Sequence, residues 1–260
     1  MGGQNWCQGR KGGEKRGTAK KGGRSALLTV GRRPRYPVTM PRTARASIGG
    51  MWYHALNRGN RGNRREAVFH KPADFDAFIQ AMRDSCTRLP LDLLGYCLMP
   101  NHFHLLLRPH ADGDLGRWMQ WLLTAHARRY HRHYSTTGHV WQGRFKAFPI
   151  EEDEHLVTVL RYVERNPLRA ELVTRAEDWK WSSLPAWQRR DALLWRGIEV
   201  RDERWLERVN EPLSAGDLGR LRGSVTRGRP YGSEQWTRET ATRLGLESCL
   251  RPRGRPPKES

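Results

Sequence analysis

The stretch that most constrains the fold is Met99–Arg108, which reads Met-Pro-Asn-His-Phe-His-Leu-Leu-Leu-Arg. Because successive side chains of a β-strand point to opposite faces, its apolar residues would face one side of a sheet and its polar residues the other. The apolar set is Phe103, Leu105 and Leu107, and the polar set is His102, His104 and Arg108. Leu91–Leu98 is a second strand pattern, and Pro100 and Asn101 favour a turn between the two. The sequence therefore predicts an antiparallel hairpin with histidines on one face.

The two histidines of this strand leave two interpretations open. Imidazoles on the same side of one strand are suited to bind a metal ion together, because a neutral ring nitrogen is a common metal ligand. Histidine is also an ordinary residue of partly buried surfaces, where it has only a structural role. The hairpin alone does not decide between metal ligation and a structural role for His102 and His104.

The elements around the hairpin predict an α+β fold. We expect a strand at Trp52–Asn57 and then a helix at Pro72–Arg88, which begins with a proline and an acidic first turn. After the hairpin, apolar spacing predicts a long helix at Asp114–Tyr134 and a further strand at Val140–Ile150. The order strand, helix, two strands, helix, strand is that of two split βαβ units. The predicted architecture is a ferredoxin-like, RRM-like sandwich, an antiparallel sheet with helices on one face.

The charge of the chain indicates a polyanionic partner. Lys and Arg number 47 against 27 acidic residues, which gives a formal net charge of +20. Nucleic acid is the leading candidate, and a membrane surface is less favoured because no run of about 18 apolar residues occurs. The four cysteines include no C-x-x-C pair, so neither a zinc site nor a disulfide framework is indicated. We therefore expect a soluble, cytoplasmic protein that binds nucleic acid.

Composition divides the chain into four expected segments. Residues 1–39 hold ten Lys or Arg, one acidic residue and recurrent glycine, and we expect a disordered basic leader. An alternative is that this leader is not translated and that Met40 is the true start. We then expect one domain at residues 40–175, a Trp-rich C-terminal extension at 176–248 and a basic tail at 249–260.

Basic residues at several points of the chain are candidates for phosphate contact. A loop of glycines, asparagines and arginines follows the first strand, although such a loop is often only solvated. Val140–Ile150 mixes aromatic and basic side chains, a combination that suits base stacking and phosphate contact. The candidate DNA-binding residues are Arg58, Arg61, Arg64, Arg108, Arg144, Lys146, Arg253 and Arg255.

The C-terminal third carries tryptophans and a repeated basic motif. We interpret Trp179, Trp181, Trp187, Trp195 and Trp205 as anchors of the C-terminal extension, with base stacking as the alternative. Arg-Gly-Arg-Pro occurs at 227–230 and at 253–256. This motif resembles an AT-hook, whose arginines enter an A/T-rich minor groove. The first copy has a simpler interpretation as a turn before a helix N-cap, so only the tail is a candidate for binding an A/T-rich duplex.

A third helix is expected at Glu151–Asn166, with Pro167 as its end. At about 100 degrees per residue, Tyr162 and Asn166 lie roughly 40 degrees apart on the flank of its apolar stripe, one turn from each other. A phenol and an amide therefore project together. A tyrosine beside an apolar helix face is usually part of the core, so this helix alone does not indicate catalysis.

Four motifs together resemble the REP-associated tyrosine transposases, bacterial relatives of the single-tyrosine transposases of small insertion sequences, within the HUH endonuclease superfamily. The motifs are Tyr53-His-Ala-Leu-Asn-Arg-Gly59, the histidine strand from Met99, Val140-Trp-Gln-Gly-Arg-Phe-Lys146 and Tyr162-Val-Glu-Arg-Asn-Pro-Leu-Arg-Ala-Glu-Leu-Val173. The resemblance implies that Tyr162 is the nucleophile and that His102, His104 and Asn166 hold Mg²⁺ or Mn²⁺. It also implies a nucleoid-associated bacterial protein that acts on single-stranded and hairpin DNA, as a monomer or a homodimer.

The implied chemistry is cleavage and rejoining of a DNA strand through a 5′-phosphotyrosine. A phenol has an ordinary pKa near 10 and is a weak nucleophile at neutral pH, so the metal would have to make the phosphodiester more receptive. Two alternatives come from other classes of protein. One is a DNA-binding regulator that uses the same sheet without cutting, and the other is a histidine-triad-like nucleotide hydrolase. Leu106 stands where the histidine-triad pattern requires a further histidine, which argues against that hydrolase.

Overall fold

The computed structural model describes residues 47–60 and 67–251. Residues Arg61 and Arg64 of the predicted arginine loop lie outside the described residues. The same holds for the expected leader at 1–39, and for Arg253 and Arg255 of the tail. All described residues belong to one compact unit.

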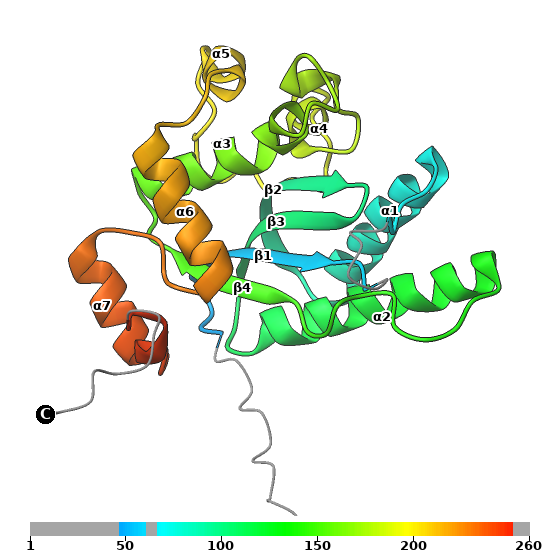
Figure 1. The fold of residues 1–260 in the computed structure, drawn as a ribbon, viewed down its shortest axis with the longest axis horizontal. Helices are drawn as coiled ribbons and strands as arrows, with labels where there is room; N and C mark the ends of the chain where they lie inside the picture. Colours follow the sequence, from blue (N-terminus) through cyan, green and yellow to red (C-terminus); the bar gives the residue numbers. More distant parts are fainter. Residues whose placement is uncertain (1–46, 61–66, 252–260) are drawn as a thin grey trace, which may run out of the picture. The chain divides into compact units, whose positions relative to one another are not determined.

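A four-stranded antiparallel sheet forms the centre of this unit (Figure 1). Its strands are β1 (Trp52–Arg58), β2 (Leu91–Met99), β3 (His102–Pro109) and β4 (Lys146–Ile150), in the order β2-β3-β1-β4. Each neighbouring pair is antiparallel, and β2 and β3 form the predicted hairpin. This is the strand order of the expected split βαβ sandwich, so the α+β fold class is confirmed.

The fourth strand is shorter than the Val140–Ile150 strand that the sequence predicted. Trp141 forms only an isolated bridge with Gly59, and Gly143 has a left-handed φ of 64°. The aromatic and branched residues of this stretch favour a strand, but the turn at Gly143 separates Trp141 from β4. Regular pairing therefore begins only at Lys146, which pairs with Leu56 of β1.

Helices α1 (Pro72–Arg88) and α2 (Asp114–Tyr134) pack on one face of the sheet, and both have the predicted bounds. Their apolar residues form a first core with the face of β3 that carries the predicted apolar set. Phe78, Met82, Trp118 and Met119 are almost completely buried in it. The alternation read from the hairpin sequence is therefore confirmed for this face of the sheet.

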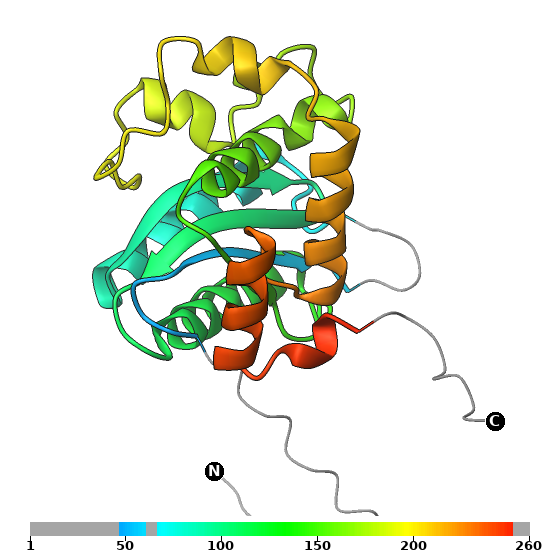
Figure 2. The ribbon, with the colours of Figure 1, turned by 90° about the vertical axis from the view of Figure 1, so that its left-hand side faces the viewer.

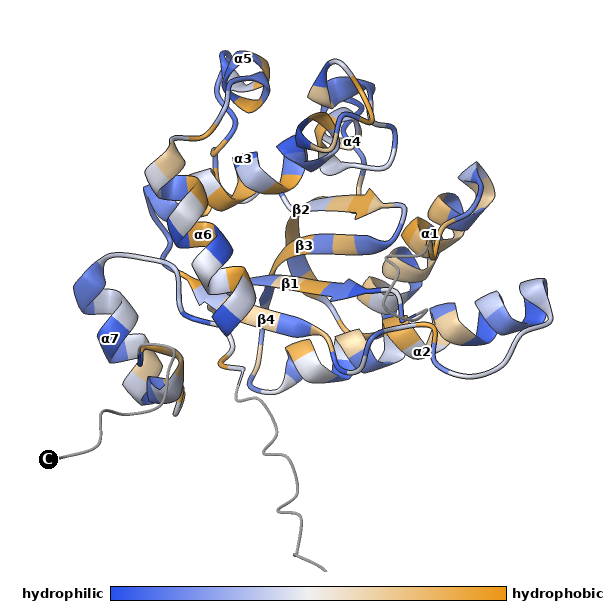
Figure 3. Ribbon diagram, in the orientation of Figure 1, coloured by the Kyte–Doolittle hydropathy of each residue, from blue (hydrophilic) through white to orange (hydrophobic). Residues whose placement is uncertain are grey.

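Helix α3 (Glu154–Arg169) covers the opposite face, so the sheet carries helices on both faces rather than on one (Figures 1 and 2). Leu56, Leu106 and Phe148 of the strands pack against apolar residues of α3 in a second core. The burial pattern of β1 and β2 explains the difference, because almost every residue of these strands is buried. Strands that are apolar on both faces require a cover on each. Figure 3 shows the apolar residues on the strands and along α3.

Helix α3 also starts and ends later than the predicted Glu151–Asn166. Asp153 caps its N-terminus by accepting a hydrogen bond from the backbone N–H of His155 at 2.8 Å. Pro167 lies inside the helix instead of ending it. A proline lacks one helical N–H, which is a smaller loss in the last turn than in the middle of a helix. The helix then ends where the Ala170 N–H bonds to the Asn166 carbonyl at 3.0 Å.

The C-terminal residues wrap around α3 and the edge of the sheet at β4. They form η1 (Ala176–Asp178), α4 (Ser183–Gln188), α5 (Trp205–Asn210), α6 (Ala215–Arg227), α7 (Glu234–Arg243) and η2 (Glu247–Cys249). Trp205, Leu221 and Tyr231 are buried in the second core, and Tyr231 exchanges backbone hydrogen bonds with the end of β4. The first Arg-Gly-Arg-Pro copy is the end of α6, where Gly228 takes the left-handed C-cap position at φ 71°.

Tryptophan side chains hold this C-terminal segment in place. Trp179 donates a hydrogen bond from its Nε1 to the Leu98 carbonyl at 2.8 Å, and Trp195 packs on Trp52 with ring centroids 5.6 Å apart. The interpretation of these residues as anchors is therefore confirmed. Among the described residues, the helices are all too short or too polar to cross a membrane.

Candidate active site

The two histidines of β3 lie on the α3 side of the sheet, as their alternation predicted. The rings of His102 and His104 are 5.0 Å apart and nearly perpendicular. His104 is buried, whereas His102 is half-buried at the start of the strand. His102 Nδ1 lies 2.5 Å from the side-chain oxygen of Asn101. This side of β3 therefore carries two imidazoles, of which that of His102 is partly accessible and that of His104 is enclosed.

A third histidine, His54 of β1, completes the cluster and was not singled out from the sequence. It is fully buried, its ring stacks on His104, and its Nε2 lies 2.8 Å from His104 Nδ1. Its sequence signals are its place in the Tyr53–Gly59 motif and its position in β1 between Trp52 and Leu56, on the side of the strand that faces α3. Pairing of β1 with β3 brings the two rings together, and a single sequence does not reveal that register.

Burial keeps His54 and His104 neutral. Loss of hydration lowers the pKa of His54 to about 3. The pKa of His104 is also held well below its ordinary value, first by burial and then by the neighbouring His54 and His102 rings and the arginines Arg169 and Arg58. A neutral imidazole retains a lone pair on one ring nitrogen, which is the form that binds a metal ion.

Tyr162 projects from α3 onto this cluster. Its ring centroid lies 5.8 Å from that of His104 and 6.1 Å from that of His54, both in edge-on geometry. The guanidinium carbon of Arg169 lies 5.0 Å from the centre of the Tyr162 ring. The predicted nucleophile and the predicted histidine ligands therefore meet within a single chain, from elements about sixty residues apart in sequence.

Asn166 lies one turn after Tyr162 and is completely buried. Its amide donates a hydrogen bond to the Tyr162 carbonyl at 2.9 Å, and its side-chain oxygen accepts one from Arg169 at 2.5 Å. The predicted ligand oxygen of Asn166 is thus bound by an arginine in this structure. The amide and the phenol lie on one flank of α3, as the helical spacing predicted.

The part of the chain that holds this cluster is similar to a known protein family. Residues 48–166 match the family model described as transposase IS200 like. Over these residues, the chain is similar to the IS200-like transposases. The matched range includes β1 to β4 and most of α3, so it covers His54, His102, His104, Tyr162 and Asn166.

Individual proteins are also similar to this chain. A Haemophilus influenzae protein described as a REP-associated tyrosine transposase is 28% identical over 117 residues, which are 41% of this chain and 66% of that protein. The matched part thus spans about two thirds of the relative's length. A solved REP-associated tyrosine transposase bound to a REP hairpin is similar with TM-score 0.47 and 19% identity, over 67% of this chain and 99% of the other. A solved Deinococcus radiodurans protein described as a transposase gives TM-score 0.33 and 22% identity, over 48% and 96% of the two chains.

Three of the predicted DNA-binding residues lie near the His102 end of the sheet. Arg58 of β1 lies opposite His102 of β3. Leu56 of β1 lies between two cross-strand partners, Lys146 of β4 on one side and His104 of β3 on the other. Arg144 lies two residues after Gln142, whose backbone N–H donates a hydrogen bond to the Arg58 carbonyl at the end of β1. All three side chains are exposed, so they form a basic rim beside the histidines.

Arg108 lies at the other end of β3 and is engaged by protein groups. Its Nε is 2.8 Å from Asp92, and its guanidinium lies 4.8 Å from the Trp52 ring and 4.6 Å from the Trp195 ring. Such a sandwich holds the C-terminal extension on the sheet. The structure therefore does not bring Arg108 together with the other predicted DNA-binding residues.

A second group of potential metal ligands lies at the start of α3. Glu151, Asp153 and His155 present one ligand atom each within 4.8 Å of one another. These atoms already have partners, because Asp153 caps α3 and Glu151 accepts the backbone N–H of Ser233 at 2.7 Å. The group shares no residue with the predicted ligands of the transposase.

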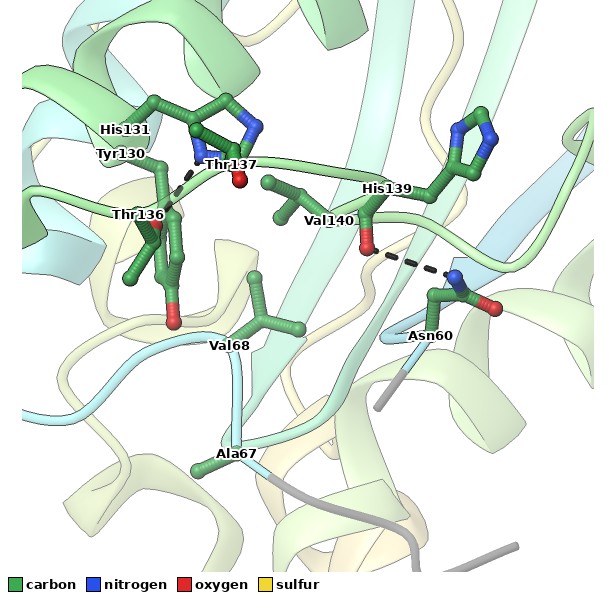
Figure 4. A pocket seen from close by; sticks show the side chains of 9 residues that line it. All are labelled: Asn60, Ala67, Val68, Tyr130, His131, Thr136, Thr137, His139 and Val140. Carbon is green, nitrogen blue, oxygen red and sulfur yellow. Dashed lines mark hydrogen bonds between the residues drawn. The ribbon is translucent and has the colours of Figure 1, made fainter. Parts of the chain in front are cut away.

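A pocket with about 290 Å³ of empty space opens beside the C-terminal end of α2 (Figure 4). Tyr130, His131 and His139 are among the residues that line it, and the Asn60 amide donates to the His139 carbonyl at 3.4 Å. Tyr130 and Val140 of this pocket belong to the first core, whereas Tyr162 belongs to the second. The pocket is therefore separate from the tyrosine and histidine cluster.

Proposed function

We propose that the protein is a divalent-metal-dependent DNA strand transferase that cuts and rejoins single-stranded DNA through a 5′-phosphotyrosine on Tyr162. The observation that carries the proposal is the packing of the Tyr162 ring 5.8 Å from His104, with His102 beside it, inside a transposase domain. A regulator that only bound DNA would need the basic rim but not this arrangement of phenol and imidazoles.

The reaction follows from the groups present. The Tyr162 oxygen attacks the scissile phosphorus in line, the phenol loses its proton, and the bond to the 3′ oxygen breaks, which leaves a free 3′-OH. The energy of the phosphodiester is conserved in the phosphotyrosine, so a 3′-OH can later attack it and rejoin strands without a nucleotide cofactor. Cleavage and strand transfer are therefore one reversible reaction.

The imidazoles and the amide of this cluster suit a cation. In His102 and His104 the Nδ1 atom is used in a hydrogen bond, so Nε2 is the candidate ligand atom of each ring. The Asn166 oxygen would be the third ligand if Arg169 released it. Two nitrogen donors favour Mn²⁺ over Mg²⁺, which prefers oxygen. A bound cation would polarise the phosphate and neutralise the charge that develops during transfer.

The substrate we propose is single-stranded DNA beside a REP-like hairpin. The resemblance to REP-associated transposases supports the hairpin, and the basic rim of Arg58, Arg144 and Lys146 would contact the strand. Tyr162 is 5% exposed, so the scissile phosphate must be unpaired and flexible to reach it. We keep Arg61, Arg64, Arg253 and Arg255 as predicted contacts, the last two for duplex DNA.

The first test is the covalent adduct. Incubation with Mn²⁺ and single-stranded DNA from the flanks of its own gene should give a phosphotyrosyl complex that survives denaturing electrophoresis. Tyr162→Phe should abolish this complex while DNA affinity changes less than about threefold, because the substitution removes only the hydroxyl. An adduct that persists in Tyr162→Phe would overturn the assignment, and a wild-type protein that binds DNA without any adduct would favour the regulator.

The second test concerns the metal. His102→Ala and His104→Ala should each lower cleavage by at least about 100-fold, because one cation ligand is lost. EDTA should abolish cleavage by the wild-type protein, and added Mn²⁺ should restore it. His139→Ala removes an exposed histidine outside the cluster and serves as the control. Cleavage that continues unchanged in EDTA would contradict a metal-dependent mechanism.

A further inference from the structure

His54 occupies an unusual place for a histidine, because three other rings pack around its own. Its own ring stacks on His104 at 5.0 Å, meets the edge of Phe148 at 5.0 Å and lies 6.1 Å from Tyr162. Its Nε2 contacts His104 Nδ1, while its Nδ1 is buried without a hydrogen-bond partner among the described residues. An unpaired buried polar atom is destabilising. A position that only needed to be filled would therefore be more stable with an apolar side chain.

The contact between the two rings links their tautomers. Each neutral imidazole carries one N–H, and the 2.8 Å contact between His54 Nε2 and His104 Nδ1 holds one proton. If His54 donates this proton, His104 carries its own N–H on Nε2 and has no lone pair for a cation. If His54 accepts, His104 carries its N–H on Nδ1 and its Nε2 is bare.

We infer that His54 is a positioning residue that accepts the Nδ1–H of His104 and thereby presents His104 Nε2 to the divalent cation. The inference rests on the proposed metal site and names the group that orients one of its ligands. Metal-binding histidines generally donate their second N–H to an oriented acceptor, and here a buried imidazole takes the place of the usual carboxylate or carbonyl. His54 is not itself a ligand, because the hydrogen bond to His104 uses its Nε2.

The test separates this role from simple packing. In the full-length protein, Mn²⁺ affinity is measured from the electron paramagnetic resonance signal of the free ion. His54→Leu fills the space without an acceptor and should weaken Mn²⁺ binding about 10- to 100-fold, while the thermal unfolding midpoint stays at or above that of the wild type. His54→Gln places an amide oxygen near the former Nε2 and should bind Mn²⁺ within about threefold of the wild type.

Controls distinguish failure of this inference from failure of the proposed function. If His104→Ala loses Mn²⁺ binding but His54→Leu binds like the wild type, only the positioning role is wrong. If His104→Ala also binds like the wild type, both the metal site and the role of His54 are wrong. Nitrogen-15 spectra of the labelled histidines provide a second readout that needs no metal. We expect His104 to carry its proton on Nδ1, and a proton on Nε2 would overturn the inference.

Discussion

The proposed role of Asn166 as a metal ligand depends on one neighbour, Arg169. Its side-chain oxygen, the predicted third ligand, accepts a hydrogen bond from Arg169, and the same arginine lies over the Tyr162 ring. One guanidinium therefore contacts both the predicted nucleophile and a predicted ligand. Beside a scissile phosphate, that positive charge would stabilise the transition state of transfer, since arginine binds phosphate oxygens through several N–H groups.

We predict that Arg169→Leu slows single-turnover DNA cleavage at least about tenfold, because the variant loses the cation beside the phosphate. Mn²⁺ affinity should not fall, since the substitution frees the oxygen of Asn166. The measurement is quenched cleavage of labelled DNA together with Mn²⁺ titration. Arg175→Leu is the control, because Arg175 is an exposed arginine that pairs with Glu177. A variant that cleaves normally but loses Mn²⁺ would contradict this assignment.

At the residue scale, much of the site could be predicted from the sequence. Alternation placed His102 and His104 on one side of a strand, and helical spacing placed Tyr162 beside Asn166. His54 was missed because a histidine between apolar residues of a strand is typical of ordinary partial burial. Its role depends on the β1–β3 register, and the bond from Arg169 to Asn166 depends on rotamers that no spacing rule encodes.

At the scale of elements, prediction succeeded where apolar residues recurred at helical spacing and the sequence also marked where the helix begins. The bounds of α1 and α2 follow from apolar spacing with a proline at one start and an acidic first turn in both. It failed at Pro167, where local propensity predicted a helix end but the chain continues for half a turn. It also failed to place helices on both faces of the sheet, because a run such as Leu91–Leu98 shows burial but not which element provides it.

One buried ion pair connects α3 to the C-terminal segment. Glu164, two residues after Tyr162, lies 2.6 Å from Arg201, and it also accepts hydrogen bonds from Ser183 at 2.6 Å and Trp205 at 2.8 Å. Both charged side chains are almost completely buried. Gly95 of β2 makes room for this cluster, because a Cβ there would lie 2.4 Å from Leu160. The segment that follows residues 48–166 therefore fixes the helix that carries the proposed nucleophile.

We predict that Arg201→Met lowers the free energy of unfolding by about 3–5 kcal/mol, because it leaves the Glu164 carboxylate buried without its cation. The double variant Arg201→Met with Glu164→Gln should recover part of that loss, since no uncompensated charge remains. Urea denaturation measures both. Arg238→Ala breaks an exposed pair with Glu234 and should change stability little. Equal losses in the single and double variants would mean that packing, not charge, dominates this position.

At the scale of the whole molecule, the sheet separates two hydrophobic cores that have different roles. The second core holds the tyrosine and histidine cluster, and the first gives the sheet a rigid back through α1 and α2. The first core also encloses a histidine, His126, which contacts the rings of Phe78 and Trp141. This histidine takes no part in the site, so it reports on the stability of the fold alone.

Burial, with a smaller contribution from Arg129 against the opposing charge of Asp74, lowers the pKa of His126 to about 3. Between this value and the ordinary 6.5, the unfolded chain binds a proton that the folded chain does not. The stability that neutral His126 provides is therefore complete above pH 6.5 and is lost as the pH falls, by about 1.4 kcal/mol per pH unit.

His126→Leu should remove this contribution. The unfolding free energy of this variant, measured by urea denaturation, should therefore fall less steeply than that of the wild type between pH 6 and pH 4. His139→Leu, at an exposed position, should keep the wild-type slope. Parallel curves for wild type and His126→Leu would show that His126 takes up its proton in the folded protein.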